Sequence, residues 1–305
     1  MAYAVGSRSS LGYIAETTFG VTPTTPTLAT LPVRSHSLNL TKERLTGADI
    51  QADRMLRTDR HGNRTAGGSI EVDLRKGDYD ALLESAFFNS WATNTLKIGT
   101  SLKSLTIEDK LDDITQHRLF TGMVVSSMSV SLAPNQMAQA TFEMIGKDMV
   151  ISATSVSASA YTAASTNEPF SADCKGTISI GGSTVGYVSA LEFSINNDVT
   201  PAFALGSCEA QQLAYGMATV EGTATMYMED ASVINAFINE TSTSLSVEID
   251  DPTGNNGLVW TFPRIKYNGA NVPLADAKER FIEVPFVALY DATSGTVLQL
   301  DRNVA

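Results

Sequence analysis

Apolar residues recur at every second position in many short stretches of this chain, and this alternation constrains its fold more than any other feature. In the stretch GSIEVDL, the alternating apolar residues are Ile70, Val72 and Leu74. The same spacing occurs in SLNL, SMSVSL, ATFEMIG, LEFSI, SLSVEI and RFIEVPFVALY. Successive side chains of a strand point to opposite faces, so this spacing predicts antiparallel strands with one buried and one solvated face. We therefore expect a mainly β protein.

Helical spacing is found in two segments. In residues 78–88, apolar side chains fall at i, i+3, i+4, i+7 and i+8, and residues 230–240 also gather theirs on one helical face. Asp78 and Asp230 stand where an N-cap is expected, because a short acidic side chain can accept a hydrogen bond from the first turn. The sequence therefore predicts one short helix in each half of the chain.

The predicted elements occur twice in the same order. Gly68 opens a strand that matches the strand opened by Gly222, and Leu38 matches Leu191. After the helix the spacing between matched positions is shorter, as between Leu132 and Leu274. A repeated order at nearly constant spacing indicates an internal duplication. We expect two tandem β-sandwich or barrel modules, each with one flanking α-helix.

A segment rich in Ser, Thr and Ala separates the two sets of elements. It covers residues 151–171 and offers few side chains that a core could bury, which is typical of a linker or a surface crossing. The first module then covers residues 1–150, including an N-terminal segment, and the second covers residues 172–305.

The overall charge limits the classes of partner. The chain of 305 residues carries a net charge of −12, and 43% of it is hydrophobic. That apolar content is sufficient for a packed core, and the acidic surface argues against a protein that grips DNA or RNA. It does not argue against a protein that lets nucleic acid pass. No apolar stretch reaches membrane-spanning or signal-peptide length, so we expect no membrane association and synthesis in the cytoplasm.

Residues that could carry chemistry are scattered. The three histidines, His36, His61 and His117, show no metal-ligand spacing, and the two cysteines imply no disulfide framework. The paired acids Asp112–Asp113 and Asp250–Asp251 flank polar turns, where solvated carboxylates are the simpler interpretation. We expect no catalytic residues, no metal and no cofactor, and this favours a role in assembly.

Residues 41–68 concentrate mixed charge between two strand-like stretches. A connection of this length is usually functional or disordered, and Ile50, Met55 and Leu56 offer it apolar anchors. Side chains of both signs suit a contact repeated between identical copies, in which basic groups of one copy meet acidic groups of the next. The residues that we expect at this inter-ring or inter-subunit contact are Lys42, Glu43, Arg44, Asp49, Asp53, Arg54, Arg57, Asp59, Arg60 and Arg64.

Several motifs together resemble the tail tube (major tail) proteins of long-tailed, siphovirus-like bacteriophages. They are the opening LGYIAETTFGVTPTTP, the charged stretch up to ADR, the strand–helix unit GGSIEVDLRKGDYDALLESAF and the later unit GTATMYMEDASVINAFINE. The resemblance runs along most of the chain. It implies a structural virion protein whose β modules close a ring around a channel, with rings stacked into a tube.

The resemblance leaves the number of chains in a ring open. If six modules close a ring, three duplicated chains suffice, and we favour such a pseudo-hexameric trimer. The segment of the second half that corresponds to the charged one, residues 196–221, contains no basic residue. This keeps open a hexamer in which the second module decorates the outside of the tube.

The resemblance also implies the partners. They are further copies of the chain, the tail terminator, tape measure and distal tail proteins, and viral DNA that passes without specific binding during ejection. An acidic channel lining would keep that passage free of phosphate contacts. The alternatives are a tube protein of a secretion system and, from another class, a β-sandwich adhesin. Two tryptophans without clustering give the adhesin little support.

Overall fold

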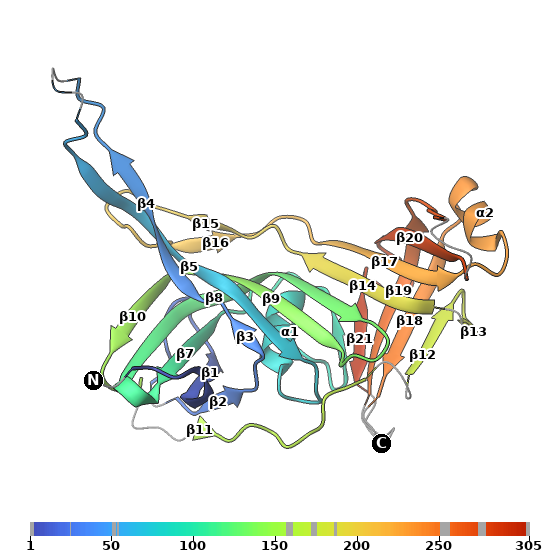
Figure 1. Ribbon diagram of the computed structural model, residues 1–305, viewed down its shortest axis with the longest axis horizontal. Coiled ribbons are helices and arrows are strands. Elements are labelled where there is room, and N and C mark those ends of the chain that lie inside the picture. Colours follow the sequence, from blue (N-terminus) through green and yellow to red (C-terminus); the bar gives the residue numbers. More distant parts are fainter. Residues whose placement is uncertain are drawn as a thin grey trace.

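The computed structural model describes residues 3–24, 26–50, 53, 55–156, 161–171, 176–185, 188–250, 257–273 and 279–302. Two β-rich bodies lie side by side, and a long two-stranded hairpin projects from the first one (Figure 1). The expectation of a mainly β fold with one helix in each half is confirmed for the described residues.

The elements of the first body precede those of the second along the chain. The first body contains β1 (Ser9–Ala15), β2 (Leu28–Leu31), β3 (Ser35–His36), β4 (Asn39–Thr46), β5 (Asp59–Asp73), α1 (Asp80–Phe87), β6 (Thr95–Lys97), β7 (Leu105–Leu111), β8 (Gln116–Leu132), β9 (Gln139–Gly146), β10 (Asp148–Ser152) and β11 (Tyr161–Thr162). The second contains β12 (Gly176–Ile180), β13 (Ser183–Val185), β14 (Val188–Asn196), β15 (Thr200–Ala202), β16 (Gln212–Ala214), β17 (Thr219–Tyr227), α2 (Ser232–Ile238), β18 (Thr243–Ile249), β19 (Leu258–Tyr267), β20 (Phe281–Ala288) and β21 (Gln299–Arg302). Two 3-10 turns, Gly6–Arg8 and Asp112–Ile114, complete the first body.

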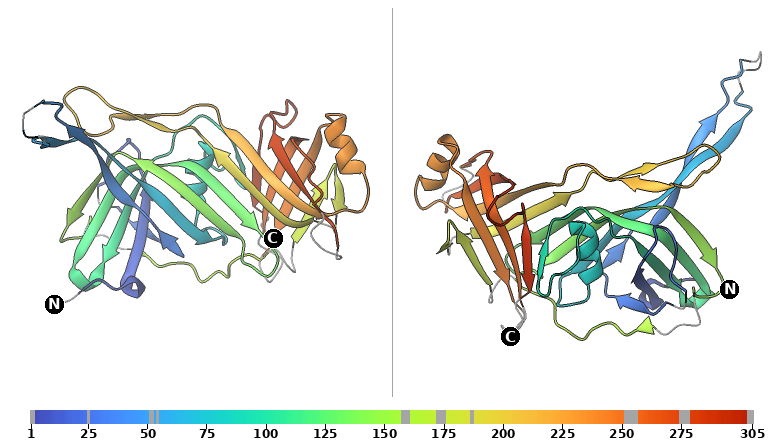
Figure 2. Two further views of the ribbon diagram at one scale, coloured as in Figure 1. Left: turned by 45° about the horizontal axis from the view of Figure 1, so that its top comes forward. Right: turned by 180° about the vertical axis from the view of Figure 1, so that it is seen from behind.

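One continuous antiparallel sheet joins the two bodies. The long strand β8 pairs with β9 on one side and with β14 of the second body on the other. At this junction Leu132 lies opposite Leu191, and Met128 lies opposite Ile195. The sheet therefore runs β4–β5–β9–β8–β14–β17–β20 across the whole molecule (Figure 2).

The two bodies have the same strand order. β5 lies between β4 and β9, and β17 lies between β14 and β20. Irregularities recur as well, because β7 shifts register against β8 between Leu105 and Ile107, and β18 shifts against β19 between Thr243 and Leu245. We call residues that occupy the same place in the two strand orders counterparts. The bulges make Ile107 the counterpart of Leu245.

The pairing register refines the correspondence expected from sequence. His36 lies opposite Ile70 in the first body, and Leu191 lies opposite Ala224 in the second. The counterpart of Leu191 is therefore His36, and the sequence match to Leu38 is wrong by two residues. The expected match had aligned similar side chains, whereas the register follows the backbone.

Each helix follows its strand but begins differently from the expectation. The residue before α1 is Tyr79, which makes no side-chain capping hydrogen bond, and the Asp78 carboxylate instead accepts a hydrogen bond from Ser165 Oγ at 2.9 Å. Asp78 is therefore not the N-cap. At α2 the Asp230 carboxylate does accept a hydrogen bond from Ser232 N at 2.8 Å, one position ahead of the structural cap.

The charged segment 41–68 is not an irregular loop. Most of it continues β4 and β5 as paired strands, with Leu45 opposite Arg60 and Thr46 opposite Asp59. Both faces of this hairpin are polar, so the alternation that reveals a half-buried strand is missing here. Backbone pairing between β4 and β5 orders most of the segment.

The segment after β10 crosses the first body and is bound to it by strand pairing and hydrogen bonds. β11 pairs in parallel with β2 (Figure 1). Tyr161 Oη donates a hydrogen bond to the fully buried carboxylate of Glu108, which also accepts one from Val156 N at 3.2 Å. His117 Nδ1 lies 3.2 Å from the same carboxylate. This crossing is thus anchored through a buried polar cluster.

Candidate assembly surface

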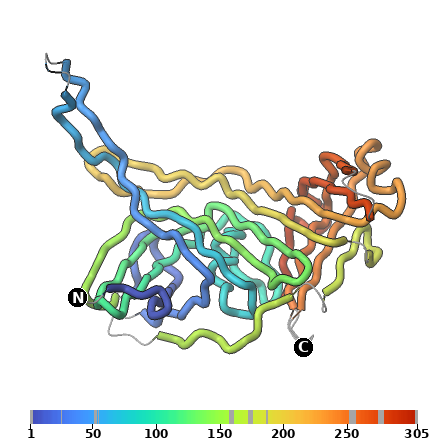
Figure 3. The backbone as a smooth tube through the Cα atoms, in the orientation of Figure 1, coloured from blue at the N-terminus to red at the C-terminus, as the bar shows by residue number. Residues whose placement is uncertain are grey.

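A hairpin arm stands away from the first body (Figures 1 and 3). We call residues 39–66 the first arm, with β4 and the first part of β5 as its sides and residues 47–58 as its tip. Every described residue from Thr41 to His61 is exposed. A hairpin this exposed lacks the tertiary packing that usually stabilises one, so a partner surface is expected.

The charged residues predicted for a contact are only partly paired within the chain. Arg44 Nε lies 2.9 Å from Asp59, and Arg57 forms an ion pair with Asp53. Among the described residues of the first arm, the following charged side chains make no ion pair: Lys42, Glu43, Asp49 and Arg60. Arg54 lies outside the described residues.

The apolar side chains near the tip are exposed too. Ile50 is fully exposed, and Met55 and Leu56 are exposed by 71% and 59%. Leu45, on the side of the arm, is exposed by 54%. They do not anchor the arm to its own chain, and exposed apolar groups of this kind mark interaction surfaces when they cluster.

A second arm arises from the corresponding place in the second body. We call residues 197–218 the second arm; its sides are β15 and β16. Unlike the first arm, it lies along the first body (Figure 3). Val199 and Leu213 are buried there against Phe88 and Val124 in a small apolar cluster.

Polar contacts fix the second arm in place. Tyr215 packs edge-on against Phe88, with the ring centroids 5.0 Å apart, and donates a hydrogen bond from its hydroxyl to Thr100 O at 2.7 Å. The buried Asn197 donates from Nδ2 to Ala86 O at 2.9 Å and to Val125 O at 3.2 Å. The second arm is therefore docked along its length.

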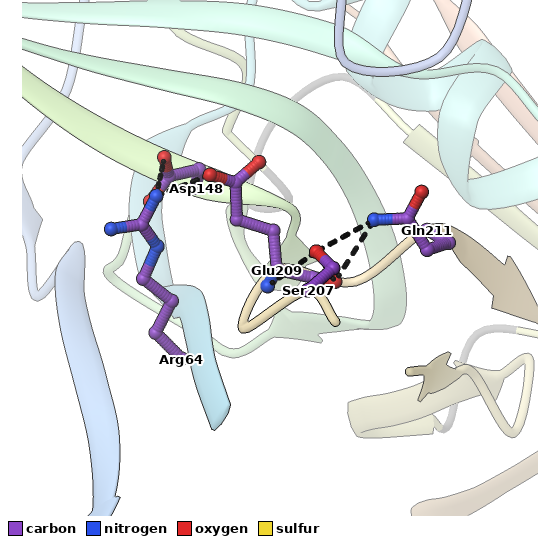
Figure 4. Close-up of polar contacts among 5 residues, drawn as sticks. All are labelled: Arg64, Asp148, Ser207, Glu209 and Gln211. Atoms are coloured by element: carbon purple, nitrogen blue, oxygen red, sulfur yellow. Dashed lines mark hydrogen bonds and ion pairs between the residues drawn. The ribbon is translucent and has the colours of Figure 1, made fainter. Parts of the chain in front are cut away.

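The tip of the second arm meets the base of the first (Figure 4). The Arg64 guanidinium binds the Asp148 carboxylate at 2.8 Å and also pairs with Glu209. Arg64 N donates to Cys208 O at 2.8 Å. Ser207 Oγ accepts hydrogen bonds from Glu209 N and from Gln211 Nε2, which shapes this turn. Of the predicted contact residues, Arg64 therefore has an acidic partner in another element of its own chain.

This arginine favours the ionised form of Asp148. Burial raises the pKa of Asp148 above its ordinary value, while a hydrogen bond from Met149 N and the charge of Arg64 oppose that rise. The carboxylate of Glu209 adds to the rise. Arg64 and Lys147 are thus the cations that favour the ionised form of Asp148 beside the Glu209 carboxylate.

Sequence reasoning missed the docking of the second arm. A signal was present, because Val199, Leu213 and Tyr215 are apolar or aromatic in a segment otherwise read as the weaker copy of the first arm. Two short strands of three residues each are too brief for a period-two pattern.

The other residues considered for chemistry are dispersed through the structure. His61 lies exposed on the first arm, whereas His36 and His117 lie beside buried carboxylates of β7. Cys208 is exposed, and Cys174 lies outside the described residues. In the described ranges, no group of three or more potential metal ligands comes together.

The family model of the phage tail tube protein matches residues 6–288. The chain belongs to this family. The chain is therefore a structural component of the virion tail that assembles into the tube with other tail components. Its family is structural and not a family of enzymes. No curated protein matches the chain in a direct comparison.

The two arms are the candidate elements for contacts between copies of the chain. No helix in the described ranges is long and apolar enough to cross a membrane. The first arm has exposed apolar groups and some charged groups that make no ion pair within the described residues. The second arm shows how such an arm docks on a β body of this kind.

Proposed function

We propose that three copies of the tail tube protein close a pseudo-hexameric ring, and that stacked rings form the tube that conducts DNA during ejection. In this proposal each body is one tube module, the two modules being residues 1–150 and 172–305 with the crossing segment 151–171 between them. The observation that carries it is the junction between β8 and β14, which joins two bodies of equal strand order into one sheet.

The ends of the continuous sheet are suited to the same junction between chains. On one side, β3 and β4 pair only with β5 among the described strands. On the other side, Asn271 pairs with Glu283 of β20. Its counterpart Ser129 pairs with Thr141 of β9 in the same way. The segment 269–273 is thus the counterpart of the part of β8 that pairs with β14. Open strand edges are templates for pairing with another chain.

Burial supports this pairing of edges. At the internal junction, Met128, Val130 and Ile195 are exposed by at most 1%. Their counterparts Ala270, Val272 and Leu40 face the same core but are only partly buried. A neighbouring copy that placed its Leu40 opposite Ala270 would complete their burial. Each buried methylene stabilises such a contact by about 0.8 kcal/mol.

The opposite face of the sheet suits a channel for DNA. Its exposed side chains include serines, threonines and one glutamate from each of five strands, β5, β9, β14, β17 and β20: Glu71, Glu143, Glu192, Glu221 and Glu283. A lining of this sign repels the phosphate backbone, so that DNA can pass without a stable contact. We propose that this face lines the lumen.

We further propose that the first arm makes the contact between copies. The residues involved are Lys42, Glu43, Arg44, Asp49, Asp53, Arg54, Arg57, Asp59, Arg60 and Arg64. Support comes from the charged groups that have no ion-pair partner in the described part of the chain, and from the exposed apolar side chains near the tip. Deletion of residues 51–60 is expected to leave folded subunits that do not polymerise. Normal tubes from that deletion would contradict this role.

The deciding experiment is electron microscopy of the purified protein at high concentration. Three chains per ring, with alternating modules around the lumen, are expected. Six chains per ring, with the second body outside, would instead support a decorated hexamer. Solitary monomers at every concentration would contradict ring formation and leave an adhesin as the better proposal. A tube that assembles but is made by a cell without a phage would indicate a secretion system.

A further inference from the structure

We propose that the first arm docks on the second body of a neighbouring copy, over the end of α2 and β19, through charged side chains. This inference rests on the proposed ring and names the surface that the arm recognises. The docked second arm supplies the template, because it shows where an arm lies on a body of this fold.

The docking site on the first body is marked by the residue after α1. Phe88 has a positive φ of 50° there, and the next residue, Asn89, donates from N to Glu84 O at 3.2 Å. The second body repeats this turn after α2. Glu240 also has a φ of 50°, and Thr241 N donates to Ala236 O at 2.9 Å. Glu240 is therefore the counterpart of Phe88.

The second residue of the site lies on the adjacent long strand. Val124 of β8 lies opposite Ile145, and Lys266 of β19 lies opposite Val287 at the matching position. Lys266 Nζ lies 3.4 Å from the Glu240 carboxylate. The apolar pair Phe88 and Val124 is thus replaced by an acid and a base in the second body.

The site on the second body is open. The Glu240 side chain is exposed by 82%, whereas Phe88 is exposed by 3% beneath the second arm. Ile238 at the end of α2 is exposed by 66%, whereas its counterpart Ala86 is fully buried. On the first body, the chain's own second arm already occupies the equivalent site.

The two arms correspond in register as well. Pro201 lies opposite Leu213 in the second arm, and Thr46 lies opposite Asp59 in the first. The arm residues that touch the first body therefore have these counterparts on the first arm: Lys42 for Asn197, Arg44 for Val199, Asp59 for Leu213 and His61 for Tyr215. Where the second arm presents apolar groups, the first arm presents charged or titratable ones.

The charges of the first arm complement those of the open site. In the proposed complex, Arg44 and His61 occupy the positions that Val199 and Tyr215 occupy beside Phe88, so they lie near Glu240 of the neighbouring copy. Asp59 then lies near Lys266 of that copy. In the isolated chain Arg44 pairs with Asp59 and Glu240 pairs with Lys266, and all four groups remain partly exposed. Docking joins two weak surface pairs into one network, which fixes partner and register more than it adds affinity.

Lys42 adds a contact with the end of α2. Its counterpart Asn197 donates to Ala86 O at the end of α1 and to Val125 O. The equivalent carbonyl groups in the second body belong to Ile238 and Tyr267. An ammonium group is favourable at the C-terminal end of a helix, where carbonyl groups lack partners.

The occupant of the open site is a second copy of the chain. The first arm projects away from α2 of its own chain, so it cannot reach its own second body (Figure 1). If Leu40 pairs with Ala270 of a neighbour, the arm that begins at Leu40 is carried onto that neighbour's second body. The contact within the chain has an apolar cluster beside the ion pairs of Arg64, whereas the contact between copies is formed mainly by charged groups. Salt should therefore weaken assembly before it weakens the fold.

A charge swap tests this inference. We compare the wild type with Glu240→Arg, with Arg44→Glu and with the double variant, using electron microscopy and sedimentation to find the concentration of half-assembly. Each single reversal is expected to raise that concentration about tenfold or more, and the double variant to return it toward wild type. Glu168→Arg, the same charge change on the crossing segment, is expected to have no effect, and circular dichroism checks folding in every case.

The outcomes separate this inference from the proposed function. If the wild type forms rings and Glu240→Arg assembles at the same concentration, the docking site is wrong and the ring stands. If both single variants fail and the double variant is not rescued, the pairing of Arg44 with Glu240 is wrong. If the wild type forms no rings at any concentration or salt, the proposed function itself is contradicted.

Discussion

Arg64 of the first arm and Glu209 of the second arm form an ion pair although 145 positions separate them in the chain. The pair ties the tip of one arm to the base of the other, and Asp148 joins it at 2.8 Å. Because the three groups come from β5, the second arm and β10, this contact links elements of both bodies.

Removal of the arginine should free the tip of the second arm. Arg64→Ala leaves two neighbouring carboxylates without their cation, and Asp148 is already disfavoured as an anion by burial. We expect a loss of about 1–2 kcal/mol of stability, since Arg64 is partly exposed. Hydrogen exchange in residues 203–211 should become faster. Arg60→Ala, on the same arm but without an ion-pair partner among the described residues, is the control, and equal exchange in both variants would contradict the role of the pair.

The apolar cluster under the second arm should contribute to the stability of the folded chain. Leu213 is 2% exposed, whereas Leu205 at the tip of the same arm is fully exposed. Leu213→Ala should therefore cost about 2–4 kcal/mol and Leu205→Ala almost nothing. Chemical denaturation of the two variants measures this difference. A second arm that is equally sensitive to both substitutions would show that burial against Phe88 does not hold it.

The strands of the bodies could be predicted from sequence because each has one buried face. The alternation of Ile70, Val72 and Leu74 predicts the inner part of β5 correctly, although the strand ends at Asp73, one residue before Leu74. The outer part of the same strand, from Asp59 to Arg64, is polar on both faces, and its sequence predicts a connection between strands rather than a strand. Hydrogen bonding to β4 orders it, and backbone pairing leaves no mark on side-chain polarity.

The candidate surface could be predicted only in part. The concentration of charge in residues 41–68 identified the first arm, but a list of charged residues does not show which are paired within the chain. Arg64 and Lys42 look alike in sequence, yet Arg64 binds Asp148 and Glu209 while Lys42 has no ion-pair partner in the described part of the chain. The docking of Val199 and Leu213 depends on contacts more than 70 residues away in sequence, which no local pattern encodes.

The crossing segment should loosen in alkali. Burial and the hydrogen bond to Glu108 raise the pKa of Tyr161 to about 12, from an ordinary value of 10.0. The folded chain therefore holds this proton more tightly than the unfolded chain. Its contribution to stability is complete below pH 10 and is lost as the pH rises toward 12.

Comparison with a phenylalanine variant isolates this effect. Tyr161→Phe removes the hydrogen bond to Glu108 and should cost about 1 kcal/mol at neutral pH. The difference in unfolding free energy between wild type and variant should shrink between pH 10 and 12. Tyr13 and Tyr79, whose pKa values are also raised, titrate in both proteins and cancel. A difference that stays constant with pH would contradict the assignment, and Tyr290→Phe at an exposed site is the control.

The proposed closure of the ring requires the backbone N–H group of Ala270. Asn271 N and O are both bonded to Glu283 of β20. In an antiparallel strand the neighbouring residue directs its own N–H to the opposite side, so Ala270 N points toward the open edge. If a neighbouring copy pairs there, Ala270→Pro removes a donor that has no partner among the described residues of the isolated chain, and proline is tolerated on edge strands.

The proline variant should fold but not close rings. We expect its thermal midpoint to stay near that of the wild type, while electron microscopy shows single subunits or open arcs. Ala270→Ser, which is similar in size and keeps the N–H group, should form normal rings. Complete rings from Ala270→Pro would mean that the chains meet elsewhere. An unfolded Ala270→Pro together with normal rings from Ala270→Ser would mean that this donor serves the fold of the subunit, which also contradicts the proposed edge.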